Sequence, residues 1–386
     1  MSARGVAILG ATGSIGRSAL AVLDQHPDRF RAVALTANRN ADALCRLAER
    51  YSPGLAVVSD APVPPGACTS PATTWRSGRE ALLEAATHPD ADVVLNALVG
   101  AAGLEPTLAA LLAGKRVALA NKESLVCGGP LVMEAARRGG GELVPVDSEH
   151  SAILQCIQGC APSEVRRLVI TASGGPFRTW TAQALAAATR ADALRHPTWD
   201  MGAKITIDSS TLANKALEVI EAHFLFGVPY ERIEAVVHPQ SIIHSMVEMV
   251  DGSVLAQMGF PTMEIPVLYA LSHPHRLPYE CRRFDPVAAG TLTFEPVDGA
   301  RFPAFGLGVD AGRAGGTAPA VFNAANEVAV AAFLAGELSF PGIADAIAHA
   351  LDRCGAGAAA TLDDVLDADA RARRATETFV RGHVPC

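Results

Sequence analysis

The sequence predicts an α/β protein with a parallel sheet at the N-terminus, a central α+β domain and a C-terminal α-helical domain. Three observations support this class. Short β-branched runs alternate with helix-like stretches through residues 1–150, mixed strand and helix patterns fill 151–272, and Ala-rich helical patterns begin at about residue 304. Strands that alternate with helices build parallel sheets covered on both faces. The 386 residues suffice for two or three domains.

Six short apolar runs in the first segment predict strands. The stretch SIGRSALAVLDQH (14–26), which follows the first run, has apolar residues at helical spacing. The predicted strands are GVAIL (5–9), RAVAL (31–35), LAVV (55–58), DVVLNAL (92–98), RVALA (116–120) and ELVPV (142–146).

From residue 151 the pattern no longer alternates regularly. Prolines punctuate residues 273–303, which predicts a linker. The predicted helices are 151–159, 181–196, 209–226, 317–336, 340–354 and 361–383, and the predicted strands are 165–173, 204–208 and those within 233–259, around an Asp-Gly turn.

Composition excludes several classes of function. The net charge is −8 and no basic run exceeds two residues, so we expect no nucleic-acid partner. No uninterrupted apolar run reaches the roughly 18 residues that span a bilayer, and no signal peptide is evident at the N-terminus. The eight cysteines are scattered. We therefore expect reduced thiols, no membrane partner and a cytoplasmic location.

A glycine-rich loop follows the first predicted strand. Gly10, Gly13 and Gly16 lie between that strand and the helix that begins near Ser14. Glycines in this context allow a tight turn and close approach of a pyrophosphate to the helix N-terminus. The loop predicts a Rossmann-like dinucleotide-binding domain, although a purely structural turn would have the same glycines.

The residues after the second strand bear on cofactor choice. Enzymes that use NAD usually carry an acidic residue here, whereas this chain has Asn38, Arg39 and Asn40. A guanidinium suits the 2′-phosphate of NADP(H). We therefore expect NADPH rather than NADH, with a solvated loop arginine as the alternative interpretation.

Carboxylates follow another strand end. Asp147 and Glu149 flank Ser148, and in an extended chain their side chains would face the same way. Two such carboxylates suit a hard divalent cation, but an Asp-x-Glu sequence on its own is more often a surface pair. Lys122, after the preceding strand, fits either a substrate contact or a surface lysine. His150 is expected to be structural.

The predicted helix 209–226 offers a third carboxylate. Asn214, Lys215 and Glu218 share one face of it, as ligands would and as a solvated face also would. Ser209 and Ser210 are expected at the helix start, where they either cap the helix or bind phosphate.

Two loops complete the candidate site. The Ser173-Gly-Gly turn has a backbone shape that can hold phosphate. The loop HPTWDMG contains His196 and Trp199, and its Trp is either a lid over ligand or a buried anchor. His238 and His244 are expected to be structural.

Seven motifs in order resemble the 1-deoxy-D-xylulose 5-phosphate reductoisomerase family: GATGSIG, NKESLV, PVDSEHSAI, ASGGPFR, HPTWDMG, DSSTLANKALE and HPQSIIHSMV. The resemblance implies a homodimeric, NADPH-dependent enzyme of non-mevalonate isoprenoid biosynthesis that uses Mg²⁺ or Mn²⁺, with Co²⁺ as a further candidate. Its sugar phosphate substrate is isomerised and reduced to 2-C-methyl-D-erythritol 4-phosphate. The resemblance further implies four segments: an NADPH-binding domain (1–150), a catalytic and dimerisation domain (151–272), a linker (273–303) and a C-terminal helical domain (304–386).

The resemblance also implies roles for particular residues. Its metal ligands fall on Asp147, Glu149 and Glu218, which with Lys122 and His196 form the implied catalytic set. The implied substrate contacts are Lys122, Ser148, Glu149, Ser173, His196, Trp199, Ser209, Asn214, Lys215 and Glu218, and the implied cofactor contacts are Thr12, Gly13, Ser14, Ile15, Asn38, Arg39, Asn40, Asn121, Glu123 and Gly202. Many members have glycine where this chain has Asn38, which leaves that backbone contact in question.

Two other functions remain open on the sequence. One is an NADP-dependent dehydrogenase with a simpler substrate, such as a homoserine or aldehyde dehydrogenase; for the latter, Cys127 would be the nucleophile, although no base is placed beside it. The other is a catalytically silent NADP-binding protein. Activity that survives EDTA would favour the first, and NADPH binding without turnover would favour the second.

Overall fold

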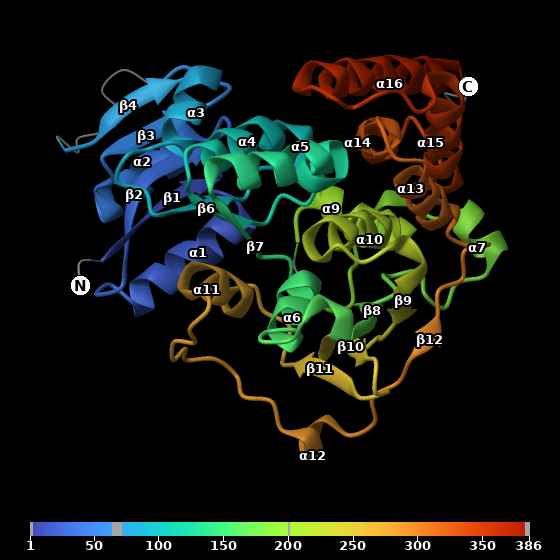
Figure 1. Cartoon of the computed structure of the whole chain (residues 1–386). Helices are drawn as coiled ribbons and strands as arrows, with labels where there is room; N and C mark the ends of the chain where they lie inside the picture. The colour runs from blue at the N-terminus through green and yellow to red at the C-terminus, as the bar shows by residue number, and fades with distance from the viewer. Residues whose placement is uncertain (1–2, 64–71, 200, 383–386) are drawn as a thin grey trace. The chain divides into compact units, whose positions relative to one another are not determined.

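A computed structural model describes residues 3–63, 72–199 and 201–382 (Figure 1). The chain divides into two compact units. The first comprises Met1–Ser124, Leu131–Ser151 and Thr262–Cys281, and the second comprises Leu125–Pro130, Ala152–Pro261 and Arg282–Cys386. The functional division of the chain at residues 150, 272 and 303 stays a prediction.

The first unit is built on a parallel sheet with the strand order β4-β3-β2-β1-β5-β6-β7 among the described residues. All six predicted strands are present. The seventh, β4, is an edge strand with the largely exposed sequence TWRS, so it has no apolar pattern to reveal it. The strands are β1 (Arg4–Leu9), β2 (Phe30–Ala37), β3 (Leu55–Val58), β4 (Thr74–Ser77), β5 (Val93–Asn96), β6 (Arg116–Leu119) and β7 (Glu142–Pro145).

Helices cover this sheet, and one of them comes from a distant part of the sequence. Helix α11 (Glu264–Ser272) packs beside α1 and contacts β6 and β7, as Figure 1 shows. It lies in the segment that the sequence assigned to the catalytic domain. The other helices are α1 (Ser14–Gln25), α2 (Ala41–Tyr51), α3 (Arg79–Ala86), η1 (Gly100–Gly103), α4 (Leu104–Leu112) and α5 (Glu123–Gly139), whose residues 125–130 are counted with the second unit.

One cysteine departs from the sequence expectation. Cys45 of α2 is disulfide-bonded, so the prediction that every cysteine is a reduced thiol is wrong for this residue. The free thiols among the described residues include the buried Cys127 and the exposed Cys281.

The second unit contains a mixed sheet with the order β11-β10-β8-β9-β12. Strands β8 and β9 run parallel, whereas β10, β11 and β12 pair antiparallel with their neighbours. The predicted strands 165–173 and those within 233–259 are confirmed. The bounds are β8 (Val165–Ala172), β9 (Ile233–Val237), β10 (Ile243–Met249), β11 (Val254–Met258) and β12 (Glu295–Pro296).

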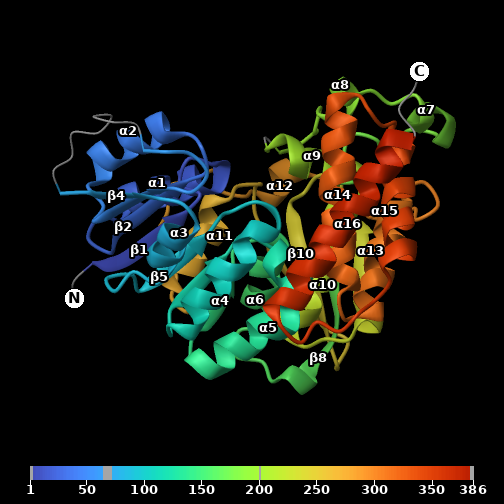
Figure 2. The same cartoon turned by 90° about the horizontal axis from the view of Figure 1, so that it is seen from above.

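One hydrophobic core joins the central and C-terminal helices of this unit. It includes Ile170 of β8, Leu217 of α10, Phe322 of α14 and Ile347 of α15, all fully or almost fully buried. Figure 2 shows α14 and α16 side by side. The helices are α6 (Ser148–Cys156), which begins in the first unit, η2 (Pro162–Glu164), α7 (Ala182–Ala186), α8 (Arg190–Ala193), α9 (Ala203–Thr211), α10 (Ala213–Phe226), η3 (Tyr230–Arg232), α12 (Pro286–Ala289), α13 (Pro303–Ala314), α14 (Ala318–Ala335), α15 (Phe340–Cys354) and α16 (Leu362–Gly382).

Helix α14 is long and apolar enough to meet the length and hydropathy criteria for a membrane span among the described residues. However, 72% of its 18-residue window is buried inside the protein. Burial against α15 and α16 accounts for its apolar composition, as for any core helix.

Two sequence expectations about residues 204–226 are wrong. KITID (204–208) is helical and belongs to α9 rather than to a strand, and the predicted helix 209–226 is two helices. Leu212 separates them with a left-handed φ of 58°. The β-branched alternation of KITID suggested a strand, but burial of Thr206 and Ile207 on the inner face of α9 outweighs that weak propensity.

Candidate active site

The loop between β7 and α6 places the first acidic residues. Asp147 immediately precedes α6, and its Oδ1 accepts a hydrogen bond of 3.3 Å from the backbone N–H of Glu149 in the first helical turn. Ser148 donates to Glu149 Oε2 at 2.6 Å. The expected extended geometry is therefore wrong, because a helix begins at Ser148. The carboxylate of Asp147 caps that helix instead.

Asp147 sits between two potential cations. Lys122, only 5% exposed, forms an ion pair with Asp147 Oδ2, and His150 Nδ1 lies 3.3 Å from Oδ1. Burial alone would raise the pKa of Asp147. The Lys122 charge and the hydrogen bond with His150 outweigh burial and hold that pKa well below its usual range. Asp147 is thus ionised at neutral pH, as a metal ligand must be.

Helix α10 supplies the third carboxylate. Asn214 Nδ2 donates to Glu218 Oε1 and Lys215 Nζ pairs with Oε2, which confirms the shared helix face. Lys215 also donates to the carbonyl of Thr171 at 2.5 Å, which ties this face to the end of β8. Lys215 and Glu218 are almost fully buried, so the face is not a solvated one.

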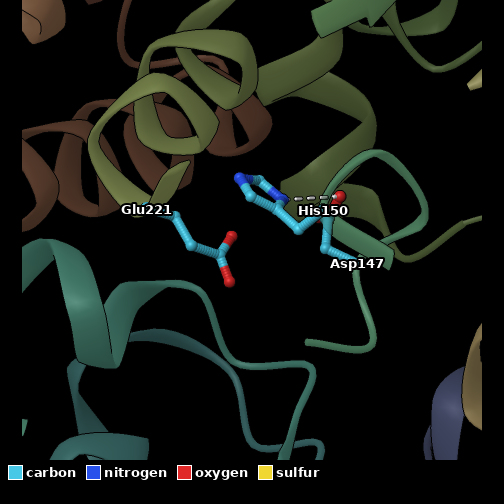
Figure 3. A group of neighbouring side chains, drawn as sticks. All are labelled: Asp147, His150 and Glu221. Atoms are coloured by element: carbon cyan, nitrogen blue, oxygen red, sulfur yellow. Dashed lines mark ion pairs between the residues drawn. The ribbon is translucent and has the colours of Figure 1, made fainter. Parts of the chain in front are cut away.

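Two overlapping groups of side chains could hold a metal ion among the described residues. Oxygens of Asp147, Glu149 and Glu218 lie within 4.8 Å of one another, and so do the ligand atoms of Asp147, His150 and Glu221. Figure 3 shows the imidazole of His150 between Asp147 and the carboxylate of Glu221. The all-oxygen group fits Mg²⁺ or Mn²⁺, which prefer carboxylate ligands. His150 contacts Asp147, the residue that the two groups share, as a neighbour that orients a ligand would.

A second polar group contains two serines and a histidine. His196 Nε2 lies 3.0 Å from Ser173 Oγ and 3.1 Å from Ser209 Oγ. Its Nδ1 accepts backbone hydrogen bonds from Trp199 at 2.9 Å and Thr198 at 3.2 Å. A nitrogen that accepts has no proton, so the neutral imidazole carries its hydrogen on Nε2 and donates it toward the serines. Both serine hydroxyls can then donate to a ligand.

Helix α9 and the Ser-Gly-Gly turn position the two serines around His196. Ser209 and Ser210 lie in the last turn of α9, so their expected position at a helix start is wrong and the capping alternative falls with it. A Cβ at Gly175, whose φ is +64°, would lie 2.8 Å from the carbonyl oxygen of Ser209. Only glycine therefore lets the Ser-Gly-Gly turn approach α9 this closely.

Burial of the His196 ring lowers its pKa to about 4. The imidazole is therefore neutral at physiological pH, in agreement with its hydrogen-bond pattern. Trp199 lies in the same loop, half-buried, with its ring centroid 6.4 Å from that of His244. Gly202 precedes the first residue of α9 in extended conformation.

The predicted dinucleotide loop has the expected geometry. Gly10 has a φ of +87°, and a Cβ there would lie 2.7 Å from the carbonyl oxygen of Ala97. A Cβ at Gly16 would lie 2.4 Å from the carbonyl oxygen of Gly10. Residues 12–15 are exposed or half-buried at the N-terminus of α1, where backbone N–H groups attract phosphate.

The three residues that follow β2 are polar. Arg39 pairs with Asp60 at 2.6 Å, and 75% of its side chain is exposed. Ser59 donates to Asn38 Oδ1 at 3.3 Å, and Asn40 caps α2 by accepting from the N–H of Ala43 at 3.1 Å. Arg39 therefore presents a cation at the position expected to select NADPH, with an acidic neighbour that sequence spacing did not reveal.

The side chains of Asn121 and Glu123 form hydrogen bonds within the protein that hold a neighbouring loop. Asn121 Nδ2 donates to the carbonyls of Leu98 (3.0 Å) and Gly100 (2.9 Å), and Glu123 Oε1 accepts from the N–H of Gly100 at 3.3 Å. Both side chains are buried. They shape the loop after β5, so a cofactor at this edge would contact a backbone that these side chains position.

Sequence reasoning did not connect His150 or Glu221 with the acidic cluster. His150 was expected to be structural, yet its ring contacts Asp147 and neighbours Glu221. Spacing offered a signal: each lies three residues after a carboxylate, Asp147 or Glu218, and residues three apart share a helix face. That signal needs the helix boundary at Ser148, which the sequence pattern did not reveal.

The fold and these groups define a class of protein: a dinucleotide-binding α/β enzyme with a cluster of oxygen ligands for a divalent metal. Comparison with known proteins makes this specific. Three family models match, described as 1-deoxy-D-xylulose 5-phosphate reductoisomerase (residues 6–129), its C-terminal domain (143–226) and DXP reductoisomerase C-terminal domain (258–375). The chain belongs to the 1-deoxy-D-xylulose 5-phosphate reductoisomerase family.

Individual relatives match this chain in sequence and structure over nearly its whole length. The reductoisomerase of Ralstonia nicotianae is 53% identical over 97% of this chain and 98% of its own length, and that of Symbiobacterium thermophilum is 52% identical over 96% and 97%. The Zymomonas mobilis enzyme in complex with NADPH superposes with a TM-score of 0.91 at 44% identity, over 98% of this chain and 99% of that one. A DOX-P reductoisomerase in complex with NADPH, fosmidomycin and magnesium gives 0.92 at 39% identity, over 98% of both chains.

Proposed function

We propose that this chain converts 1-deoxy-D-xylulose 5-phosphate to 2-C-methyl-D-erythritol 4-phosphate, with NADPH as the hydride donor and Mg²⁺ or Mn²⁺ as the metal. One observation carries this proposal: three carboxylates gather within 4.8 Å in a member of the reductoisomerase family. The reaction first rearranges the carbon skeleton to an aldehyde. Hydride and a proton then reduce that aldehyde to the alcohol, so NADPH becomes NADP⁺.

Asp147, Glu149 and Glu218 would hold the metal. A bound divalent cation supplies Lewis-acid polarisation of the ketone and hydroxyl oxygens of the substrate. Lys122 keeps Asp147 ionised and lies where it can contact substrate oxygens. Ser148 donates to Glu149 and thereby orients the ligand beside it. Both rearrangement routes, retro-aldol with re-addition and α-ketol shift, make use of these residues.

The serine and histidine group would bind the substrate phosphate. His196 donates toward Ser173 and Ser209, which leaves both hydroxyl hydrogens available to phosphate oxygens. Asn214 and Lys215 of α10 add a second donor and a cation. Binding energy at the phosphate can then close the loop of Trp199 over the reacting end, which excludes water from hydride transfer.

NADPH would bind at the N-terminus of α1. Backbone N–H groups of residues 12–15 would face the pyrophosphate, and Arg39 would face the 2′-phosphate. Asn38 and Asn40 border the same subsite, while Asn121, Glu123 and Gly202 border the nicotinamide end in our assignment. In this assignment the cofactor contacts lie in residues 1–150 except for Gly202, whereas the substrate contacts come from both 1–150 and 151–272.

We further propose a homodimer in the cytoplasm. Val254, Leu255 and Met258 of the edge strand β11 are exposed apolar residues, which suits a strand that pairs with a second copy of the chain. Sedimentation of the purified protein tests this, because a monomer at micromolar concentration would contradict it.

The proposed activity is tested by following NADPH oxidation with 1-deoxy-D-xylulose 5-phosphate. We expect turnover with added Mn²⁺ or Mg²⁺ and none with excess EDTA. Persistent activity in EDTA would favour a metal-independent dehydrogenase instead. Tight NADPH binding without turnover would favour a silent binding protein.

A further inference from the structure

Within the second unit, one buried polar contact joins the C-terminal helices to α9. Asn326 of α14 donates from Nδ2 to Asp208 Oδ1 at 2.8 Å. Asn326 is fully buried and Asp208 is 1% exposed. The two residues are 118 positions apart, so no local constraint of the chain brings them together.

The second oxygen of Asp208 is also engaged. Lys204, one turn earlier on α9, approaches Asp208 Oδ2 with its Nζ at 2.7 Å. The carboxylate therefore has a cation on its own helix and an amide from another. The cation compensates the buried charge, whereas the amide fixes where α9 lies against α14, because a hydrogen bond is directional.

The turn of α9 that contains Asp208 also contains Ser209. The Oγ of Ser209 lies 3.1 Å from His196 Nε2, which in turn reaches Ser173. The backbone of Ser209 packs against Gly175, where no Cβ fits. A shift or rotation of α9 would therefore change the spacing between the two serine hydroxyls.

Stability alone explains the Asn326 contact poorly. Its Oδ1 is buried and has no hydrogen-bond partner among the described residues. A leucine of similar shape would fill the same space without burying an unsatisfied carbonyl. A polar pair that adds little stability can still select one arrangement of two helices.

We propose that Asn326 is a positioning residue for phosphate binding: through Asp208, it holds α9 so that Ser209 and Ser173 meet the substrate phosphate together. This inference rests on the phosphate role proposed above for the two serines. It gives the C-terminal helices a part in substrate affinity, although Asn326 itself touches neither substrate nor cofactor.

The test compares Asn326→Leu with the control Asn323→Leu. Asn323 lies one turn earlier on α14, is equally buried and donates to Glu327 of the same helix at 2.9 Å. In Asn326→Leu we expect KM for the sugar phosphate and Kd for fosmidomycin to rise about tenfold, with kcat within about threefold. NADPH affinity should not change. Asn323→Leu should leave both constants within about twofold.

A reciprocal exchange separates positioning from packing. The double variant Asp208→Asn with Asn326→Asp restores an amide–carboxylate pair across the same two helices. We expect it to recover most of the lost affinity for fosmidomycin, measured by calorimetry with NADPH and Mn²⁺ present. It also provides a second variant if Asn326→Leu fails to fold, as judged by circular dichroism.

Equal losses of affinity for the sugar phosphate and fosmidomycin in the Asn323 and Asn326 variants would overturn the inference. Unchanged KM and Kd in Asn326→Leu would also overturn it, and so would a folded exchange variant that does not recover affinity for fosmidomycin. A wild-type protein that neither binds fosmidomycin nor turns over the sugar phosphate would instead refute the proposed function. The two failures are therefore distinguishable.

Discussion

Replacement of Arg39 by glutamine should weaken NADPH binding and leave NADH binding nearly unchanged. The guanidinium is 75% exposed, so its interaction with a 2′-phosphate takes place in a water-like dielectric. Two unit charges 4 Å apart interact there by about 1 kcal/mol, and a phosphate near −2 doubles that value. NADH lacks this phosphate and gives the internal comparison.

The acidic neighbour reduces the expected effect. Asp60 already pairs with Arg39 at 2.6 Å, so part of the cation's attraction is engaged before cofactor arrives. We therefore expect a loss of about 1–2 kcal/mol, or about five- to thirtyfold in Kd, for Arg39→Gln. Arg39→Glu changes the charge by two units and should cost about thirtyfold to several hundredfold.

Fluorescence titration with NADPH and NADH at two ionic strengths measures this effect. The NADPH loss should shrink in high salt because the charges are exposed. Arg50→Gln is the matched control: Arg50 is 64% exposed and pairs with Asp24 at 2.8 Å, away from the cofactor loop. An unchanged NADPH/NADH ratio in Arg39→Glu, or an equal loss in the Arg50 variant, would refute the reasoning.

Two further predictions concern the metal and phosphate groups. Asp147→Asn and Glu218→Gln each remove one ligand charge, so we expect turnover to fall at least about a hundredfold and Mn²⁺ affinity to drop, with NADPH Kd nearly intact; wild-type rates in either variant would contradict the three-carboxylate site. Burial lowers the pKa of His196 to about 4, whereas an unfolded chain binds that proton near 6.5. Its contribution to stability is therefore complete above pH 6.5 and lost as pH falls toward 4, so His196→Gln should flatten the urea-unfolding stability profile in that window. An equal loss of stability with falling pH in the wild type and in His196→Gln would show that another group titrates in this window.

Much of the fold could be predicted because parallel strands buried on both faces leave continuous β-branched runs. Strands β1, β2, β3, β5 and β6 are largely buried and apolar, and the edge strand β7 is buried in its last two residues. Strand β4 lacks such a run, because an edge strand with exposed side chains needs no apolar face. The apolar alternation of residues 204–208 predicts a strand, but it is a local signal, and the packing that makes these residues part of α9 is not.

The site was predictable as a set of residues but not as a geometry. Motif order identified Asp147, Glu149 and Glu218 together, yet the helix that begins at Ser148 changed how the first two meet. His150 gained a role only when its ring was placed beside Asp147. Contacts between distant segments, such as that of Asn326 with Asp208, leave no mark on either local pattern.

In the candidate site, basic side chains lie beside the acidic ones. An Asp carboxylate beside Glu149 and Glu218 would be costly to ionise in isolation. Lys122 and His150 offset that cost for Asp147, while Lys215 pairs with Glu218.

The most direct test of the central claim is the rate of NADPH oxidation by the purified protein with 1-deoxy-D-xylulose 5-phosphate, with metal removed and then restored. We predict no turnover in excess EDTA, full recovery on addition of Mn²⁺ or Mg²⁺, and 2-C-methyl-D-erythritol 4-phosphate as the product in equal amount to NADP⁺. Oxidation that continues without metal, or none at all with metal present, would contradict the account.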